Sequence, residues 1–165
     1  MSAATPTVDT GKLREVLGRF TTGVTIITCI DASGVRVGLT ANSFNALSLA
    51  PPLVLWSLRT VSPSMAAFRL APHFVVNVLA ESQVDLSRRF ASKNEDRFAD
   101  GVWSAGLGGA PVLAGAAAVL QCQAFAQHEL GDHVLFIGQV QALSDAPVPP
   151  LVYQAGHYRL LGEVL

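Results

Sequence analysis

The apolar and polar positions of this chain follow the periods of short helices and short strands. Near the start, four apolar residues recur at the spacing of one helical face; they are Leu13, Val16, Leu17 and Phe20. Asp9 or Thr10 stands where a helix cap is expected. The pattern predicts an amphipathic helix that packs against another surface.

Most other apolar residues lie in β-like runs separated by turn residues. Residues 24–28 and 35–42 flank the turn sequence at 31–34, which predicts an antiparallel hairpin. Further runs cover residues 53–58, 74–79, 116–127, 134–143 and 151–153. Many strands joined by short turns favour a closed or nearly closed antiparallel barrel over a parallel α/β fold. We therefore expect a mainly β protein.

Two more short helices are expected at the periphery of this barrel. The first begins near Ser62 or Ser64 and ends before Pro72, and the second covers residues 81–90 with Phe90 facing inward. Between residues 93 and 100 the charges crowd and the apolar spacing fails, so we expect a mobile surface loop there.

Length and composition favour one domain with some apolar surface covered by a second copy. The chain has 165 residues, of which 50% are apolar and 14% charged. These fractions lie above and below ordinary globular usage respectively, which favours a homodimer. We expect a short disordered lead over residues 1–9 and a single domain over residues 10–165. The lead lacks the pattern of a secretory signal, which favours a cytoplasmic location.

Charge and motif content exclude several classes of function. The net charge of −1, with 11 Lys and Arg spread along the chain, offers no basic face for nucleic acid. The uncharged stretch 38–58 carries Asn42 and Ser43 beside a double proline, which excludes a membrane span. Cys29 and Cys122 lie in apolar runs without metal-ligand spacing, so buried free thiols and no metal site are expected.

The glycine-rich sequence GLGGAP at residues 106–111 lacks the third glycine of a dinucleotide fingerprint and runs into proline. The sequence also has no GxxxxGK[ST], HExxH or GxSxG motif. What remains is a hydroxyl- and amide-rich turn after Gly38, between two β-like runs. Such a turn suits an uncharged, ring-shaped ligand.

Five segments, in order, resemble one known family. They are FTTGVTIIT (20–28), GLTANSF (38–44), LS (47–48), PPLV (51–54) and GDHVLFIGQV (131–140). The combination resembles the short-chain flavin reductases, FMN-binding split-barrel proteins that supply reduced flavin to two-component monooxygenases. The resemblance runs from about residue 19 to residue 160 and implies an antiparallel split β-barrel with a few peripheral short helices. Because the same barrel serves other flavin proteins, the fold alone does not settle the function.

The resemblance implies a flavin site and a site for the hydride donor. The implied flavin-binding residues are Thr40, Ala41, Asn42, Ser43, Ser57, Leu58, Ser62, Ser64, Arg89 and Phe90. The implied NADH-binding residues are His133, Tyr153, Gln154, Ala155 and Gly156. Turn formation, helix capping and core packing are the alternative roles for the same residue types. Some relatives carry a lysine near residues 63–64, so Arg59 or Arg89 is expected to replace it beside the flavin phosphate.

The implied activity is NAD(P)H:flavin oxidoreduction with FMN or FAD, without a metal or a catalytic acid or base. NADH is favoured over NADPH because no arginine cluster is placed to bind a second phosphate. The alternative is a non-catalytic flavin-binding or electron-carrier module on the same barrel. A pyridoxine-phosphate-type oxidase would need a more basic phosphate pocket than Ser62, Pro63 and Ser64 provide. The implied partner is a monooxygenase that receives diffusible reduced flavin, and the sequence leaves open whether the flavin stays bound.

Overall fold

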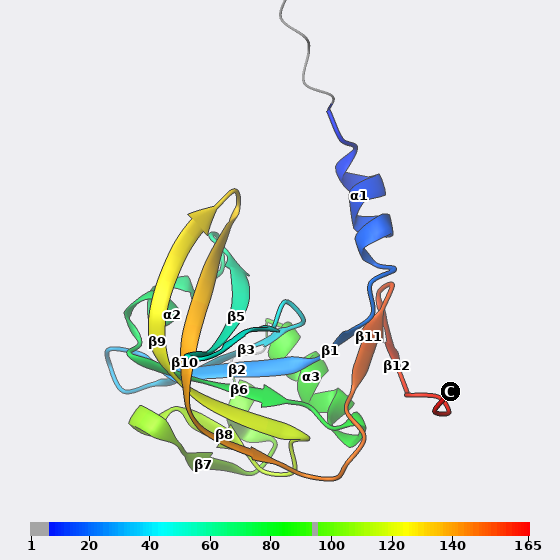
Figure 1. Ribbon diagram of the computed structural model, residues 1–165. Helices are drawn as coiled ribbons and strands as arrows, with labels where there is room; N and C mark the ends of the chain where they lie inside the picture. Colours follow the sequence, from blue (N-terminus) through cyan, green and yellow to red (C-terminus); the bar gives the residue numbers. More distant parts are fainter. Residues whose placement is uncertain (1–6, 94–95) are drawn as a thin grey trace, which may run out of the picture.

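One antiparallel sheet of seven strands forms most of the protein, for which the computed structural model describes residues 7–93 and 96–165. The strands are β2 (Thr25–Ile30), β3 (Arg36–Ala41), β4 (Asn45–Leu49), β5 (Pro52–Arg59), β6 (His73–Val78), β9 (Ala118–Leu130) and β10 (His133–Asp145). Their order is β3-β2-β6-β9-β10-β5-β4, and the sheet curls strongly on itself (Figure 1). In the described residues, β3 and β4 form the two ends of the sheet. The expected mainly β split barrel is confirmed.

Around this barrel, the residues that the structure describes form two small sheets and six short helical segments. One sheet contains β1 (Thr22–Gly23), β11 (Val152–Gln154) and β12 (His157–Arg159), and the other contains β7 (Trp103–Ala105) and β8 (Pro111–Leu113). The α-helices are α1 (Thr10–Leu17), α2 (Met65–Leu70) and α3 (Val84–Ala91). The 3₁₀ turns are η1 (Glu81–Gln83), η2 (Arg97–Ala99) and η3 (Leu107–Gly109).

The barrel core is built by alternation along its strands. In β5, Val54, Trp56 and Leu58 are buried while the intervening side chains are more exposed, as the two-residue period of a strand requires. Trp56 stacks on Phe136 of β10 with ring centroids 4.6 Å apart. Phe68 of α2 meets the edge of Trp56 at 4.8 Å, so α2 is packed against this end of the core.

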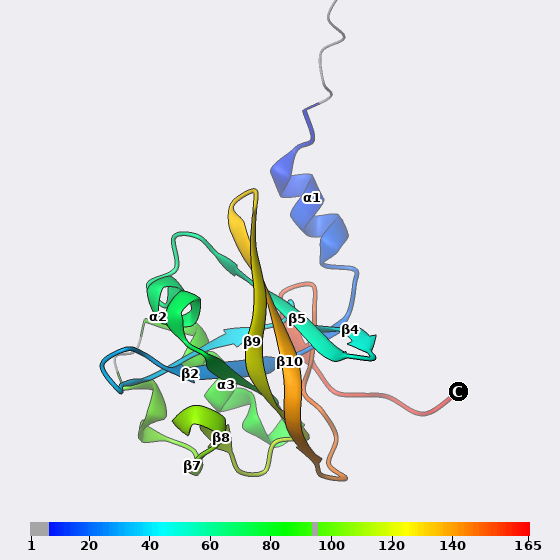
Figure 2. The ribbon, with the colours of Figure 1, turned by 60° about the vertical axis from the view of Figure 1, so that its left-hand side comes forward.

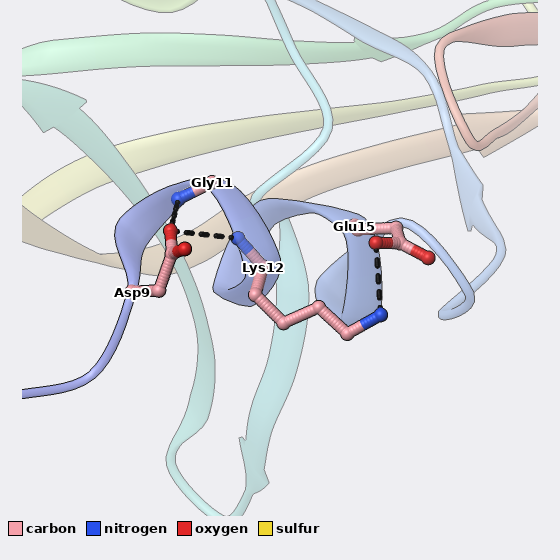
Figure 3. Close-up of polar contacts among 4 residues, drawn as sticks. All are labelled: Asp9, Gly11, Lys12 and Glu15. Atoms are coloured by element: carbon pink, nitrogen blue, oxygen red, sulfur yellow. Dashed lines mark hydrogen bonds and ion pairs between the residues drawn. The ribbon is translucent and has the colours of Figure 1, made fainter.

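Helix α1 forms as expected, but none of its residues contributes to a buried core. Asp9 caps it, because its Oδ1 accepts from Gly11 N at 2.7 Å and Lys12 N at 3.2 Å, and Lys12 pairs with Glu15 (Figure 3). The helix ends at Leu17, before Phe20, and none of its residues is buried. It stands away from the barrel in both views (Figures 1 and 2). The expected packing of this helix is therefore not made by residues 7–93 and 96–165.

Two segments that were expected as a turn and a loop contain regular structure. Residues 45–49, expected as part of a polar turn, form edge strand β4, which pairs with β5. The expected surface loop at 93–100 contains η2, and Phe98 packs against a core cluster. Residues 94–95 of that loop, and residues 1–6 of the expected N-terminal lead, lie outside the described residues. Within the described ranges, no helix is long and apolar enough to cross a bilayer.

Candidate functional site

A cavity of about 520 Å³ opens along the outer edge of β3. Its walls come from the β2–β3 turn, from β3, from η2, and from α2 together with the two residues before it. The cavity is lined by polar, aromatic and small residues, which include Arg36, Gly38, Pro63, Ser64, Arg97 and Phe98. Because β3 ends the sheet, no strand of the described residues pairs with its outer edge. The cavity therefore combines an open strand edge with two cationic side chains.

Arg97 is fixed at this edge by the backbone. Its Nη1 donates to Gly38 O at 2.7 Å, and its Nη2 donates to Ser92 O at 2.8 Å. Its Nε is buried and has no hydrogen-bond partner among the described residues. The guanidinium therefore keeps hydrogen-bonding capacity beyond the contacts that hold it.

Arg36 and Phe98 form the aromatic part of the cavity. The Arg36 guanidinium lies over the Phe98 ring, 4.8 Å from its centroid. Phe98 is held from behind by Phe90 and Trp103, whose ring centroids each lie 5.0 Å from its own. Phe90, an expected flavin contact, is only 1% exposed. It supports Phe98 and Gly38 from within the core and is not part of the cavity lining.

The expected flavin segment consists of Thr40 and Ala41 at the end of β3 and the two residues that follow the strand, and most of its polar groups hold the fold together. Thr40 Oγ1 donates to Ser87 O at 2.7 Å, and Ala41 O accepts from Thr25 Oγ1 at 2.7 Å. Ser43 Oγ donates to Ser57 O and accepts from Ser57 N, at 3.1 and 3.0 Å. These bonds fix the turn against α3, β2 and β5.

Asn42 differs from its neighbours in this turn. Its side chain is exposed and makes no hydrogen bond within residues 7–93 and 96–165. The amide can therefore offer both a donor and an acceptor to a ligand.

Of the residues expected beside the flavin phosphate, Ser64 lines the cavity. It precedes α2 and is 8% exposed, and its backbone N–H donates to Ser62 Oγ at 3.3 Å. Leu58 belongs to the barrel core. Ser57 is tied to Ser43, as described above.

The expected cationic partners lie elsewhere. Arg89 forms an ion pair with Asp100 and donates to Asp96 O at 3.0 Å, so its charge is already compensated. Arg59 pairs in register with His133 at the far end of β5. The structure instead places Arg36 and Arg97 at the cavity.

His133 lies at the tip of the long β9–β10 hairpin, at the first residue of β10. Its Nδ1 lies 2.7 Å from Asp132 Oδ1, and its side chain is 42% exposed. The hydrogen bond and positive charge from His133 lower the pKa of Asp132. The Asp132 carbonyl accepts from Thr60 N at 3.0 Å, which ties the tip to the end of β5. The imidazole is thus held by one nitrogen, and its other nitrogen is left for a ligand.

The second expected NADH segment forms the β11–β12 turn. Ala155 and Gly156 have φ of 49° and 82°, and Ala155 N donates to Gly18 O at 3.0 Å. Tyr153 and Tyr158 pack together with centroids 5.5 Å apart, and Gln154 precedes the turn. This hairpin and the β9–β10 tip lie apart in both views (Figures 1 and 2). Within one chain, the two expected NADH contacts do not meet.

Sequence reasoning missed Arg36, Arg97 and Phe98. The signal available was an aromatic residue, Phe98, placed next to Arg97 in a charge-rich segment without apolar periodicity. Nothing in that pattern relates the segment to β3, because the contact between them is made only by the fold.

Comparison with known proteins gives a family match and close relatives. The family model described as "Flavin reductase like domain" matches residues 17–162. The probable flavin reductase of Rhizobium meliloti (strain 1021) is 41% identical over 160 residues, which are 95% of this chain and 51% of that protein. This chain therefore spans about half the length of that relative.

Two further relatives match over most of their own length. The reductase subunit HsaB of a flavin-dependent monooxygenase from Mycobacterium tuberculosis (strain CDC 1551 / Oshkosh) is 42% identical over 92% of this chain and 82% of its own. The NADH:FAD oxidoreductase SgcE6 of Streptomyces globisporus C-1027 is 34% identical, with a TM-score of 0.88 over 100% of this chain and 96% of its own. SgcE6 has also been solved in complex with NAD and FAD fragments.

Proposed function

The chain belongs to the flavin reductase like domain family, and on this premise we propose that it is an NAD(P)H:flavin oxidoreductase that reduces FMN or FAD. The observation that carries the proposal is the cavity of about 520 Å³ beside β3, the strand that leads into the segment at residues 40–43; none of those four residues lines the cavity itself. This volume is within the range of about 300–1,000 Å³ of small-molecule sites.

The residues present fit a flavin. The exposed Asn42 amide offers donor and acceptor groups to the polar edge of an uncharged ring. Arg36, Arg97 and Ser64 offer cationic and hydroxyl groups to a phosphate. The chemistry that a bound flavin supplies is the acceptance of a hydride from NADH, so the protein needs no acid or base for that step.

The contribution of this chain is therefore positioning. The Ser43–Ser57 hydrogen bonds hold the turn rigid, and Arg97 is held at the strand edge by Gly38 O. Asp132 orients the His133 imidazole through Nδ1, which leaves Nε2 to contact the carboxamide or phosphate of the dinucleotide. We favour NADH as the donor, as in the relative named NADH:FAD oxidoreductase.

The decisive experiment is steady-state NADH oxidation by the purified protein, first without flavin and then with FMN, FAD or riboflavin. Turnover that depends on added flavin supports a reductase whose flavin diffuses. Bound flavin with no oxidation of NADH or NADPH would contradict the reductase and favour a flavin-carrier module.

The His133→Ala variant tests the donor site. We expect a clear rise in the KM for NADH with little change in the KM for flavin, since one hydrogen bond to the donor is lost. His128→Ala is the matched control, because His128 is also exposed on β9 and makes no hydrogen bond among the described residues. Equal changes in both constants would contradict the assigned role.

We further propose that reduced flavin passes by diffusion to a separate monooxygenase component in the cytoplasm. The support is that several relatives are named as reductase subunits of such enzymes. A coupled assay that physically separates the two components behind a dialysis membrane would test it under anaerobic conditions.

A homodimer is also part of the proposal. Its support is the apolar face of α1, where Val16 and Leu17 are 56% and 60% exposed. On edge strand β4, Leu49 is 95% exposed. Exposed apolar side chains that gather on one face of an element are typical of protein–protein contacts.

A further inference from the structure

Alternate residues of β3 place different functional groups on one face of the strand. Arg36, Gly38 and Thr40 alternate with the residues that face the barrel core, so they share one face. Arg97 is bound at Gly38, and the Arg36–Phe98 pair lies two residues further from the turn at 40–43. With about 3.3 Å of rise per strand residue, the Arg36 position lies roughly 7 Å beyond Gly38. In the cavity, Arg97 and Arg36 therefore lie at successive positions along β3, with Arg97 nearer the segment at residues 40–43.

The charges that face this cavity favour an anion. Its ionisable lining residues are Arg36, Arg97 and Asp31. Asp31 closes the β2–β3 turn, where its Oδ1 accepts from Ser33 N at 2.8 Å and Val35 N at 2.9 Å. Among the described residues, neither arginine forms an ion pair with a carboxylate. The positive charge of the two arginines therefore exceeds the negative charge of Asp31, whose carboxylate already accepts hydrogen bonds from the backbone.

Arg36 also provides a flat stacking surface. Its guanidinium covers one side of Phe98 and is exposed on β3. Planar guanidinium groups stack on aromatic rings and on nucleic-acid bases, which compact ammonium groups do not do. Phe90 and Trp103 hold Phe98 in place, so the surface is rigid before any ligand arrives.

We propose that this part of the cavity is the subsite for the adenosine end of FAD. In this assignment Arg97 contacts the phosphate next to the ribityl chain, which FMN and FAD share, and Arg36 stacks on the adenine, which FMN lacks. The protein therefore binds FAD more tightly than FMN. This inference rests on the proposed flavin reductase function and names the flavin that it prefers.

Equilibrium titration of the flavin-free protein with FAD, FMN and riboflavin, followed by flavin fluorescence, tests the proposal. We expect the Kd for FAD to be about tenfold lower than that for FMN, from one stacked base. Arg36→Ala should remove most of this difference by weakening FAD alone. Arg36→Lys should not restore it, because lysine keeps the charge and loses the plane.

Arg14→Ala is the matched control, because Arg14 is an exposed arginine on α1, and it should leave all three constants unchanged. Equal Kd values for FAD and FMN in the unaltered protein would overturn the proposal. So would an Arg36→Ala variant that weakens FMN as much as FAD, because Arg36 would then contact the shared phosphate. These outcomes leave the reductase function intact, whereas the absence of any flavin binding or flavin-dependent NADH oxidation would contradict that function itself.

Discussion

At the scale of single residues, Gly38 sets how closely α3 and η2 approach β3. A Cβ added there would lie 2.7 Å from Phe90 Cε1 and 3.2 Å from Phe98 Cζ. We expect Gly38→Ala to destabilise the fold by about 1–3 kcal/mol through overpacking. It should also displace the rings that support Arg36.

Thermal unfolding monitored by circular dichroism measures this effect. Gly23→Ala is the control, because a Cβ there meets nothing within 4 Å. It should change stability by no more than about 0.5 kcal/mol. A Gly38→Ala protein as stable as the control would show that the rings can move aside.

The two buried thiols make a separate prediction about pH. Burial raises the pKa of Cys29 and Cys122 to about 12, from an ordinary value of 9.0. Both thiols therefore stay protonated in the folded state at pH values where they ionise in the unfolded chain. Their contribution to stability is complete below pH 9 and declines as the pH rises towards 12.

Urea unfolding at several pH values, with a Cys29→Ala/Cys122→Ala variant as reference, isolates this contribution from other titrations. Relative to that variant, the unaltered protein should lose stability between pH 9 and 12. A thiol reagent at pH 8 should label neither cysteine until the protein is unfolded. Rapid labelling of the folded protein would contradict the assigned burial.

At the scale of elements, Asn77 joins three strands. This buried residue of β6 donates from Nδ2 to Ile26 O of β2 at 3.1 Å, and its Oδ1 accepts from Leu113 N of β8 at 2.8 Å. Asn77→Ala leaves buried backbone groups without partners, and each such group costs about 1–3 kcal/mol. Chemical denaturation should show this loss, while Gln123→Ala, at an exposed site of β9, should stay within about 0.5 kcal/mol of the unaltered protein. Retained stability in Asn77→Ala would mean that water replaces the amide.

The strands differ in how well the sequence pattern predicts them. Strands β2, β6 and β10 carry dense β-branched or alternating apolar residues, and the predicted runs match them closely. Strand β4 was missed because its apolar side chains face outward and its Asn45 and Ser48 resemble turn residues. An edge strand of this kind has no buried face to produce an alternating pattern.

The candidate site was also predicted from the sequence only in part. The segments quoted for the family resemblance led to the turn at 40–43, because turn chemistry is local. Arg97 reaches the cavity through a hydrogen bond to Gly38, 59 positions away in the chain. Contacts at that separation depend on how α3 and η2 pack against the barrel, which no local pattern encodes.

At the scale of the whole molecule, the expected NADH site is divided between the β9–β10 tip and the β11–β12 hairpin. The apolar face of α1 and the exposed Leu49 also have no packing partner in the part of the chain that the structure describes. A homodimer would cover these apolar surfaces and could bring the two donor segments together across the interface.

The Leu17→Glu variant tests this assembly. Leu17 is 60% exposed on the apolar face of α1, and glutamate keeps the helical propensity while removing apolar area from both copies. At about 1.5–3 kcal/mol per leucine side chain, we expect the dimer dissociation constant to rise by about a hundredfold or more. Sedimentation equilibrium measures it directly.

Glu15→Gln is the control, because Glu15 lies on the opposite, polar face of α1, where it pairs with Lys12. A monomeric protein before any substitution would remove the dimer from the proposal, and His133 and the β11–β12 hairpin would then have to serve separate ligands. If instead Leu17→Glu yields a folded monomer with a raised KM for NADH and an unchanged Kd for flavin, the donor site is completed by the second copy while the cavity beside β3 is complete within one chain.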